Sequence, residues 1–403
     1  MNINRKSFIK SSFIASSAFL INVPILATQK TNNELSKQIK ITDLKTYVFK
    51  KATFVKIETD SGISGWAEGD HSNPKLVSKV INDICKKEVI GADPFDTELL
   101  WNNMFFKGED VGTQGVLTGA IAGIDNALWD LKGKILGLPV HKLAGGNGLK
   151  KVRVYGSFGR TGGPNGIRTP EEMGKIAADF VNQGYKTIKA RMQIRQLNID
   201  PDPDPTFETI KAVRKAIGDD VELFVDFNNG YTPSRAITIA KKLIEHFNVA
   251  AIEEPVSYLN YQGLNQVVEA LDIPIFAGEH EFNRWQIRDL VTIGNADFIN
   301  ADLIKAGGFS ECRKMAFIAR AFDKYIMTHN TRPTLATAAS LQLCASIPNA
   351  ARVQEYAGQR IDLDLSNLFK DYFEFKDGYL SIPQVPGLGL TVNEEEMEKN
   401  KLN

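Results

Sequence analysis

Three short apolar segments between residues 221 and 279 each end in acidic residues: VELFVDFN (221–228), VAAIEEP (249–255) and IPIFAGE (273–279). Two segments of helical periodicity separate them. Apolar strands that alternate with amphipathic helices are typical of a parallel sheet covered by helices. Asp226, Glu253 and Glu279 follow one another at spacings of 27 and 26 residues, about one unit of a β/α barrel. The stretch therefore predicts part of such a barrel, with acidic groups at the carboxyl ends of its strands.

The same alternation extends on both sides of this stretch. The remaining strands are expected at VRVYGSF (152–158), TIKARM (187–192), FINADL (298–303), YIMTHN (325–330) and ARVQEY (351–356). The predicted fold class is α/β, as a modified TIM barrel, (β/α)7β, in residues 151–356.

A separate α+β domain is expected in residues 38–150. It opens with an antiparallel meander that contains an Asp60-Ser61-Gly62 turn. A long helix follows, and its small residues favour close packing. The irregular residues 357–403 are expected to return to this first domain.

Residues 1–30 have the features of a signal peptide. Arg5, Lys6 and Lys10 flank the start of an apolar, serine-rich segment that ends at Ala27. The start also resembles a twin-arginine export signal, with Lys6 in place of the second arginine. The sequence therefore predicts export, in a bacterial cell to the periplasm, with no membrane attachment after cleavage. An uncleaved anchor stays open as an alternative.

The composition is that of an ordinary soluble protein. The 403 residues include 48 Lys and Arg and 48 Asp and Glu, so no overall field attracts nucleic acid or a membrane surface. The three cysteines, Cys85, Cys312 and Cys344, are widely spaced, which favours buried free thiols over disulfides. We therefore expect a local site, and not the overall charge, to select the ligand, which is expected to be a small molecule.

Carboxylates at the ends of adjacent parallel strands lie side by side and repel one another unless a cation binds between them. Ligand sets made only of oxygen suit Mg²⁺, so a Mg²⁺ site is expected here. The alternative is that the three acids are unrelated and cap the helices that follow them.

Several motifs together resemble the enolase superfamily, in its mandelate racemase subgroup. They are VKIETDSGISGWAEG (55–69), AIAGIDNALWDLKGK (120–134), the DFN, IEEP and AGE strand ends, ADLIKAGG (301–308) and the TH of YIMTHN. The resemblance runs from about residue 38 to the end, and it implies that the N-terminal domain caps the barrel. It also implies that Asp226, Glu253 and Glu279 ligate the metal. Glu254, next in sequence, is expected to point to the opposite face.

His329 is the expected general base, paired with Asp302. The two residues are 27 apart, at the ends of the sixth and seventh strands. A carboxylate bonded to one imidazole nitrogen raises the basicity of the other nitrogen. The alternative is a core histidine beside a capping aspartate. The family resemblance further assigns an electrophilic carboxyl group to Glu355 on the last strand.

Lys189 and Arg191 share one face of the second strand. The family pattern is usually Lys-x-Lys, whose second lysine is a base. A guanidinium stays protonated, so Arg191 is expected to bind charge and not to accept a proton. The alternative is a pair of surface basic residues.

Four more residues are candidates for contact with substrate. Asn228 is expected to face the same pocket as Asp226 and to bind a substrate hydroxyl. His280, in GEHEFNRW, resembles a residue of acid-sugar dehydratases, although a core histidine is the alternative. Asp70 and His71 lie in the loop where the family's capping domain closes over substrate.

The predicted function is Mg²⁺-dependent dehydration of a hydroxylated carboxylate, with a sugar acid as the expected substrate, through an enediolate to a 2-keto acid. Racemase, epimerase or cycloisomerase activity at the same site is the first alternative. A sugar-acid binding protein without catalysis is the second, although binding alone needs no base. The protein is also expected to form homo-oligomers.

Overall fold

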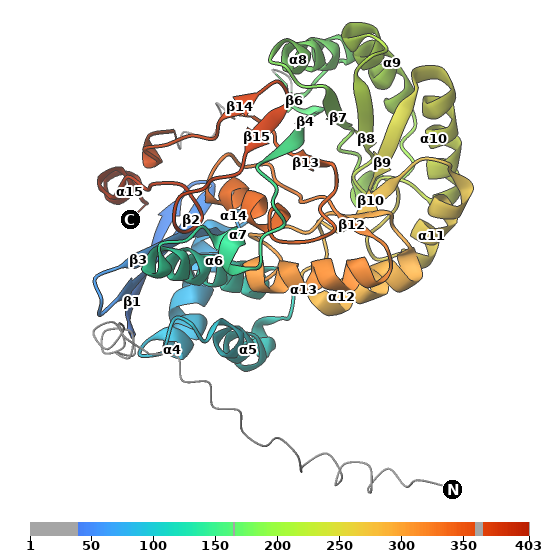
Figure 1. Ribbon diagram of the computed structural model, residues 1–403. Helices are drawn as coiled ribbons and strands as arrows, with labels where there is room; N and C mark the ends of the chain where they lie inside the picture. The colour runs from blue at the N-terminus through green and yellow to red at the C-terminus, as the bar shows by residue number, and fades with distance from the viewer. Residues whose placement is uncertain (1–38, 164–165, 359–365, 403) are drawn as a thin grey trace, which may run out of the picture. The chain divides into compact units, whose positions relative to one another are not determined.

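The computed structural model describes residues 39–163, 166–358 and 366–402 (Figure 1). The predicted signal peptide, residues 1–30, lies outside the described residues. In the described part the barrel strands are β4 (Lys151–Gly159), β7 (Thr187–Arg191), β8 (Glu222–Asp226), β9 (Val249–Glu253), β10 (Ile275–Ala277), β11 (Phe298–Ile299), β12 (Tyr325–Ile326) and β13 (Val353–Glu355). Each lies within a segment that the sequence predicted to be a strand, except that β4 extends one residue beyond its predicted segment at each end.

Parallel pairing joins these strands in chain order from β4 to β12, and β13 pairs with β4. The remaining gap is bridged at Ile326, which exchanges backbone hydrogen bonds with Asn349 and Ala351 just before β13. The sheet therefore closes into a barrel. The register sets Asp226 opposite Glu253, so the two acidic strand ends lie at one level.

Helices connect successive barrel strands and cover the outside of the barrel (Figure 1). They are α8 (Pro170–Asn182), α9 (Thr206–Ile217), α10 (Pro233–Phe247), α11 (Tyr261–Ala270), α12 (Arg284–Asp289), α13 (Gly308–Ala321) and α14 (Leu335–Cys344). The start of α8 shows why such helices begin where they do. Thr169 and Glu172 form a reciprocal capping box, and Pro170 occupies the first helical position.

Short elements complete the loops of the barrel. They are the hairpin β5 (Thr161–Gly163) and β6 (Gly166–Ile167), the turn η3 (Gln196–Asn198) and the helical turn η4 (Leu290–Gly294). Inside the barrel, aromatic and aliphatic side chains form a buried cluster, among them Tyr155, Phe224 and Phe276. The interior of the barrel is therefore filled by packed side chains, which support the carboxyl ends of the strands.

The N-terminal region is a three-stranded antiparallel meander covered by helices. Its strands are β1 (Ile41–Phe49), β2 (Ala52–Thr59) and β3 (Ser64–Gly69). Its helical segments are α3 (Pro74–Val80), η1 (Ile81–Cys85), α4 (Lys86–Val89), α5 (Thr97–Lys107), η2 (Glu109–Val111), α6 (Val116–Leu136) and α7 (Val140–Leu143). The predicted turn at Gly62 joins β2 to β3, and its φ of 79° suits glycine.

Glycines let α6 pack closely on the meander, as the sequence predicted. A Cβ added at Gly123 would lie 2.9 Å from Val55 Cγ2 and 3.2 Å from Gly69 Cα. Any larger residue there would push the helix off the sheet.

Helix α6 also binds the barrel. The Asn126 side-chain nitrogen Nδ2 donates to the Leu303 carbonyl at 2.8 Å, and its oxygen Oδ1 accepts from the Phe309 backbone N–H at 2.9 Å. Asp125 accepts hydrogen bonds from the Ser310 backbone and hydroxyl at 2.8 and 2.6 Å. These contacts fix the loop that carries Asp302.

The last described segment contacts both regions. It contains η5 (Ser366–Leu368), β14 (Phe375–Lys376), β15 (Tyr379–Ser381) and α15 (Glu394–Asn400). Strand β15 pairs antiparallel with β4 of the barrel, while Glu394 bonds Lys56 and Trp66 of the meander. The chain thus ends against the region in which its described part begins.

All three cysteines are free and buried. Of the helices in the described ranges, none combines the length and the apolar character needed to cross a bilayer.

Candidate active site

Buried carboxylates gather at the carboxyl ends of β8, β9 and β10. Asp226 and Glu253 are fully buried, and Glu254, Glu279 and Glu281 are at most 9% exposed. Asp226 and Glu253 occupy the last positions of their strands, and Glu279 lies two residues beyond β10. Burial of so many acids at one level requires compensating cations or protons.

Asp226 is held in place by Asn228. The Asn228 backbone and side-chain amides donate to the two Asp226 oxygens, each at 2.7 Å. The Asn228 side-chain oxygen Oδ1 accepts from the Gln193 backbone N–H at 2.6 Å. The structure therefore places Asn228 beside Asp226, as expected, but uses its amide to orient that carboxylate.

Glu253 faces a buried lysine. Lys189, which has no exposed surface, bonds Glu253 and lies 3.1 Å from Glu355. Burial lowers the lysine pKa, but the charges of Glu253 and Glu355 outweigh it and hold the pKa well above its usual value. Burial likewise opposes ionisation of Glu355, yet Lys189 brings its pKa to about 2. Glu355 is thus an ionised partner of Lys189 here, and its role as the electrophilic carboxyl group stays a prediction.

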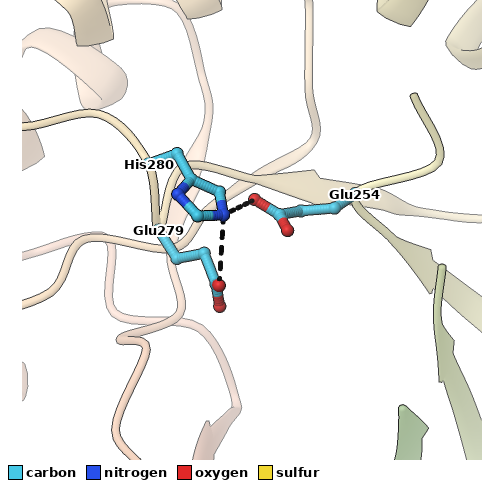
Figure 2. A group of neighbouring side chains, drawn as sticks. All are labelled: Glu254, Glu279 and His280. Carbon is cyan, nitrogen blue, oxygen red and sulfur yellow. Dashed lines mark ion pairs between the residues drawn. The ribbon is translucent and has the colours of Figure 1, made fainter. Parts of the chain in front are cut away.

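Glu254 departs from the expected orientation. Its φ of 42° lies in the left-handed region, so the alternation of side chains along β9 ends at this residue. Its carboxylate turns toward Glu279 and His280 (Figure 2). The His280 Nε2 atom lies 3.6 Å from Glu254 and 3.5 Å from Glu279. Glu254 therefore lines the site instead of the opposite face.

His329 and Asp302 form the expected pair. The His329 Nδ1 atom lies 2.7 Å from Asp302 Oδ2, and Nε2 lies 2.9 Å from Glu279 Oε2. Burial lowers the His329 pKa, but the Glu279 charge and the bond to Asp302 raise it to about 10. The imidazole is therefore protonated at neutral pH and paired with Glu279. A divalent cation bound to Glu279 would leave His329 Nε2 free to accept a proton.

The acids of the site fit a divalent cation. Burial, together with the charge of Glu279, raises the pKa of Asp226 to about 6 against the opposing charge of Lys189. Burial raises the pKa of Glu253 to about 8, and burial together with the charge of Glu279 raises the pKa of Glu254 well above its usual value. One oxygen of Glu254 is buried with no hydrogen-bond partner. Oxygen ligands that are buried, crowded and only partly satisfied are what a hard divalent ion requires.

Lys305 is a site residue that the sequence analysis missed. Burial lowers its pKa, but Glu279, Asp302 and Asp70 raise it above the usual value. Its ammonium group donates to the Glu279 carbonyl at 3.0 Å. The signal was present in the ADLIKAGG motif, where Lys305 is the basic residue nearest Asp302.

Arg191 lies on the rim of the site. It is half-buried, its Nε atom has no hydrogen-bond partner, and its charge lowers the pKa values of Asp226 and Glu355. These observations place a permanent cation next to the carboxylate cluster, as the sequence predicted.

The N-terminal region reaches the site through the loop after β3. His71 lines a small pocket together with His329, Asp302 and Arg332. Burial lowers the His71 pKa to about 3, so its ring is neutral. Asp70 accepts from the Ser72 backbone and hydroxyl at 3.0 and 2.9 Å and shapes the loop.

Glu68 anchors the loop that follows His329. The Arg332 Nε atom donates to Glu68 Oε1 at 2.5 Å, and the Thr334 hydroxyl bonds the other Glu68 oxygen. Both Glu68 and Arg332 are at most 3% exposed. The meander and the loop that follows His329 are therefore joined by a buried ion pair.

A β/α barrel with an N-terminal capping region, and with buried acids and a His–Asp pair at the carboxyl ends of its strands, is typical of one class of metal-dependent enzymes. Matches to two family models identify this class. Residues 27–145 match the mandelate racemase/muconate lactonizing enzyme N-terminal domain, and residues 172–396 match the enolase C-terminal domain-like family. The chain therefore belongs to the mandelate racemase/muconate lactonizing enzyme family of the enolase superfamily, whose members use a divalent metal. The predicted fold class and family are confirmed.

Similar proteins cover nearly the whole chain. D-galactonate dehydratase of Xanthomonas oryzae pv. oryzae is 30% identical over 91% of this chain and 95% of its own length. Arabinonate dehydratase of Saccharolobus solfataricus is 28% identical over 86% of this chain and 89% of its own. The solved structure of 3,6-anhydro-D-galactonate cycloisomerase from Zobellia galactanivorans superposes with a TM-score of 0.79 at 30% identity, covering 90% of this chain and 100% of that one.

Proposed function

We propose that this protein is a Mg²⁺-dependent hydro-lyase that dehydrates a sugar acid to a 2-keto-3-deoxy acid. The observation that carries the proposal is the His329–Asp302 pair beside the buried carboxylate cluster. The similarity to D-galactonate and arabinonate dehydratases supports the same reaction type and a hydroxylated carboxylate as substrate. Asp226, Glu253 and Glu279 are the proposed Mg²⁺ ligands.

The chemistry requires a base and a source of positive charge. The α-proton of a carboxylate is weakly acidic, because its removal adds charge to an anion. Mg²⁺ would supply the positive charge that favours this removal. His329 Nε2 accepts the α-proton while Asp302 holds the ring through Nδ1. The β-hydroxyl then leaves as water with a proton returned by His329, and the enol product tautomerises to the 2-keto acid.

The cations near the site favour chemistry with one base. Racemisation needs a proton acceptor on each face of the α-carbon. Arg191 cannot accept a proton, and Lys189 is held protonated between Glu253 and Glu355. His329 is thus the group best placed to exchange a proton, and β-elimination needs no second base.

Cycloisomerisation is the second candidate, because of the similarity to the Zobellia galactanivorans enzyme at 30% identity. An elimination whose leaving oxygen stays attached to the same carbon chain gives an isomer and releases no water. The two reactions share the removal of the α-proton, so His329 serves both.

A panel of aldonic, aldaric and anhydro sugar acids tests the proposal. We expect at least one acid to lose the mass of one water and to form a 2-keto acid in the presence of Mg²⁺. His329→Asn should lower turnover by roughly 10²- to 10⁴-fold, the usual scale for loss of a general base. The matched control is His246→Asn, because His246 is exposed on α10. Inversion of the α-centre in D₂O without loss of water would contradict dehydration.

Export and self-association complete the proposal. The basic start and the apolar segment that ends at Ala27 support cleavage shortly after that residue. Sequencing of the N-terminus of protein from the native cell tests this, and an intact Met1 on cytoplasmic protein would contradict it. The homo-oligomer is tested by the mass of the protein in solution.

A further inference from the structure

We propose that the small pocket between the loop after β3 and the loop after β12 is a subsite for one hydroxyl group of the substrate. A water molecule takes the same place when no substrate is bound. His71, Asn330 and Arg332 supply the polar atoms of this subsite. The inference rests on the proposed function and deepens it, because it says which group the sugar acid presents beside His329. That group is a hydroxyl, as in an aldonic acid, and not the second carboxylate of an aldaric acid.

The pocket lies beside the proposed base and is very small. His329 and Asp302 line it together with His71, Asn330 and Arg332. Its volume is about 10 Å³, which is the room that one water molecule needs. The pocket therefore fits a single oxygen atom with its protons, and a carboxylate group is too large for it.

Three of the residues around this pocket each carry a polar atom that is buried and unpartnered. In the part of the chain that the structure describes, no group bonds His71 Nδ1, Asn330 Oδ1 or Arg332 Nη2. Asn330 is 5% exposed and Arg332 is 3% exposed, so bulk water does not replace the missing partners. Each buried polar atom without a partner is unfavourable. Three such atoms around one cavity indicate a ligand that bonds all of them.

The free oxygen of Asn330 needs a donor. The Nδ2 atom of the same side chain donates to the Thr337 hydroxyl at 2.8 Å and to the Glu355 carbonyl at 3.3 Å. The Thr337 hydroxyl donates its own proton to the Arg332 carbonyl at 2.5 Å, so it can only accept from Asn330. Exchange of the amide nitrogen and oxygen would lose both bonds. Asn330 Oδ1 is therefore the acceptor that the pocket presents.

Arg332 presents a donor, and His71 can take either role. The Arg332 Nε atom donates to Glu68, which fixes the plane of the guanidinium group, and Nη2 stays available as a donor. Burial, together with the charge of Arg332, lowers the pKa of His71 to about 3, so its ring is neutral. A neutral imidazole has one N–H group and one lone pair, so Nδ1 can donate or accept.

These requirements together select a hydroxyl group or water. The occupant must donate to Asn330 Oδ1 and accept from Arg332 Nη2 at the same time. A carboxylate can only accept and an ammonium group can only donate, whereas a hydroxyl does both. A substrate hydroxyl reproduces the hydrogen bonds of the water that it displaces. An analogue without this hydroxyl does not, and it should bind more weakly.

A high-resolution crystal structure of the full-length, Mg²⁺-loaded protein tests the pocket without any choice of substrate. We expect one ordered water about 3 Å from each of Arg332 Nη2, Asn330 Oδ1 and His71 Nδ1. In a complex with a sugar acid that the enzyme turns over, a substrate hydroxyl should occupy this position. A pocket filled by a protein side chain, or one without any oxygen, would overturn the proposal. A complex in which the water stays in place would also overturn it.

Kinetics with an active aldonic acid and its singly deoxygenated derivatives identify the hydroxyl. We expect one derivative to lose roughly 10- to 100-fold in kcat/KM, the scale for loss of a hydrogen bond to a charged group. His71→Leu should raise KM for the intact acid and leave that derivative unchanged. His71→Asn, whose amide can replace Nδ1, should recover most of the loss. His246→Leu, which alters an exposed histidine, is the matched control and should affect neither acid.

Equal losses with His71→Leu for the intact acid and for every derivative would overturn the proposal. A preference for the aldaric acid over the corresponding aldonic acid would do the same. Failure of the proposed function is distinguishable from failure of this inference. Dehydration by a protein whose pocket holds no oxygen would remove only the inference. A water bonded to all three atoms, in a protein that dehydrates no sugar acid, would support the subsite and remove only the reaction assignment.

Discussion

Asp226 is a fully buried carboxylate among other acids, so its negative charge is unfavourable without a cation beside it. Asn228 orients both of its oxygens, and burial raises its pKa to about 6. We expect Asp226→Asn to lower Mg²⁺ affinity by at least about 10- to 100-fold and to abolish turnover. The metal-free variant should be at least as stable as the wild type, because a buried charge is gone. Calorimetry with Mg²⁺ and chemical denaturation measure the two effects.

The exposed Asp219, changed to Asn, is the matched control for Asp226→Asn, and it should alter neither binding nor stability. Full activity in excess EDTA, with no metal left on the protein, would contradict the metal assignment.

The positions of the site residues were not equally predictable from the sequence. The positions of Asp302 and His329 at successive strand ends were enough to predict their contact. Glu254 was misplaced because side-chain alternation holds only for extended backbone, and its positive φ ends the strand. Lys305 was missed because its partner, the Glu279 carbonyl, belongs to another loop.

At the scale of elements, the strands were predictable because each carries a buried apolar segment. The strands that precede Asp302 and His329 are shorter than expected. Strand β11 ends at Ile299 and β12 at Ile326, three residues before Asp302 and His329. Both residues therefore belong to loops, and contacts from other elements must fix them. Such contacts join distant parts of the chain and leave no local pattern in the sequence.

Helix α6 contains a buried cation that pH can test. Lys132 is 7% exposed, lies 3.5 Å from the centre of the Trp129 ring and bonds the Thr97 hydroxyl. Burial lowers its pKa to about 8, from 10.5. The unfolded chain therefore binds more protons between these values, and the free energy of unfolding rises with pH across this window.

We expect Lys132→Met to raise the free energy of unfolding at pH 7 by about 1–3 kcal/mol and to remove its rise between pH 8 and 10. Denaturation at several pH values, compared with Lys175→Met at an exposed position of α8, measures the difference. Identical pH slopes in the Lys132→Met and wild-type proteins would show that Lys132 is not the titrating group.

At the scale of the molecule, the buried pair of Glu68 and Arg332 joins the meander to the barrel. Glu68→Gln leaves the Arg332 guanidinium buried without its counter-charge. We expect a loss of about 3–5 kcal/mol in the free energy of unfolding, the scale for one broken partner of a buried pair. Turnover should also fall, because Arg332 lies three residues after His329.

A double-mutant cycle measures the interaction energy between Glu68 and Arg332. It compares the free energy of unfolding of four proteins: the wild type, Glu68→Gln, Arg332→Met and the double variant. The double variant should recover part of the stability that Glu68→Gln loses. Strictly additive losses would mean that the two side chains do not stabilise each other.

The hydrogen bonds between α6 and the barrel affect how this enzyme could be re-engineered. Asn126 and Asp125 bind the segment that follows Asp302, so the N-terminal region takes part in positioning Asp302, the partner of His329. A chimera that grafts the equivalent region of a relative onto this barrel to change specificity must transplant those two side chains with it. A graft without them would misalign the proton-transfer pair even if the new binding loop were correct.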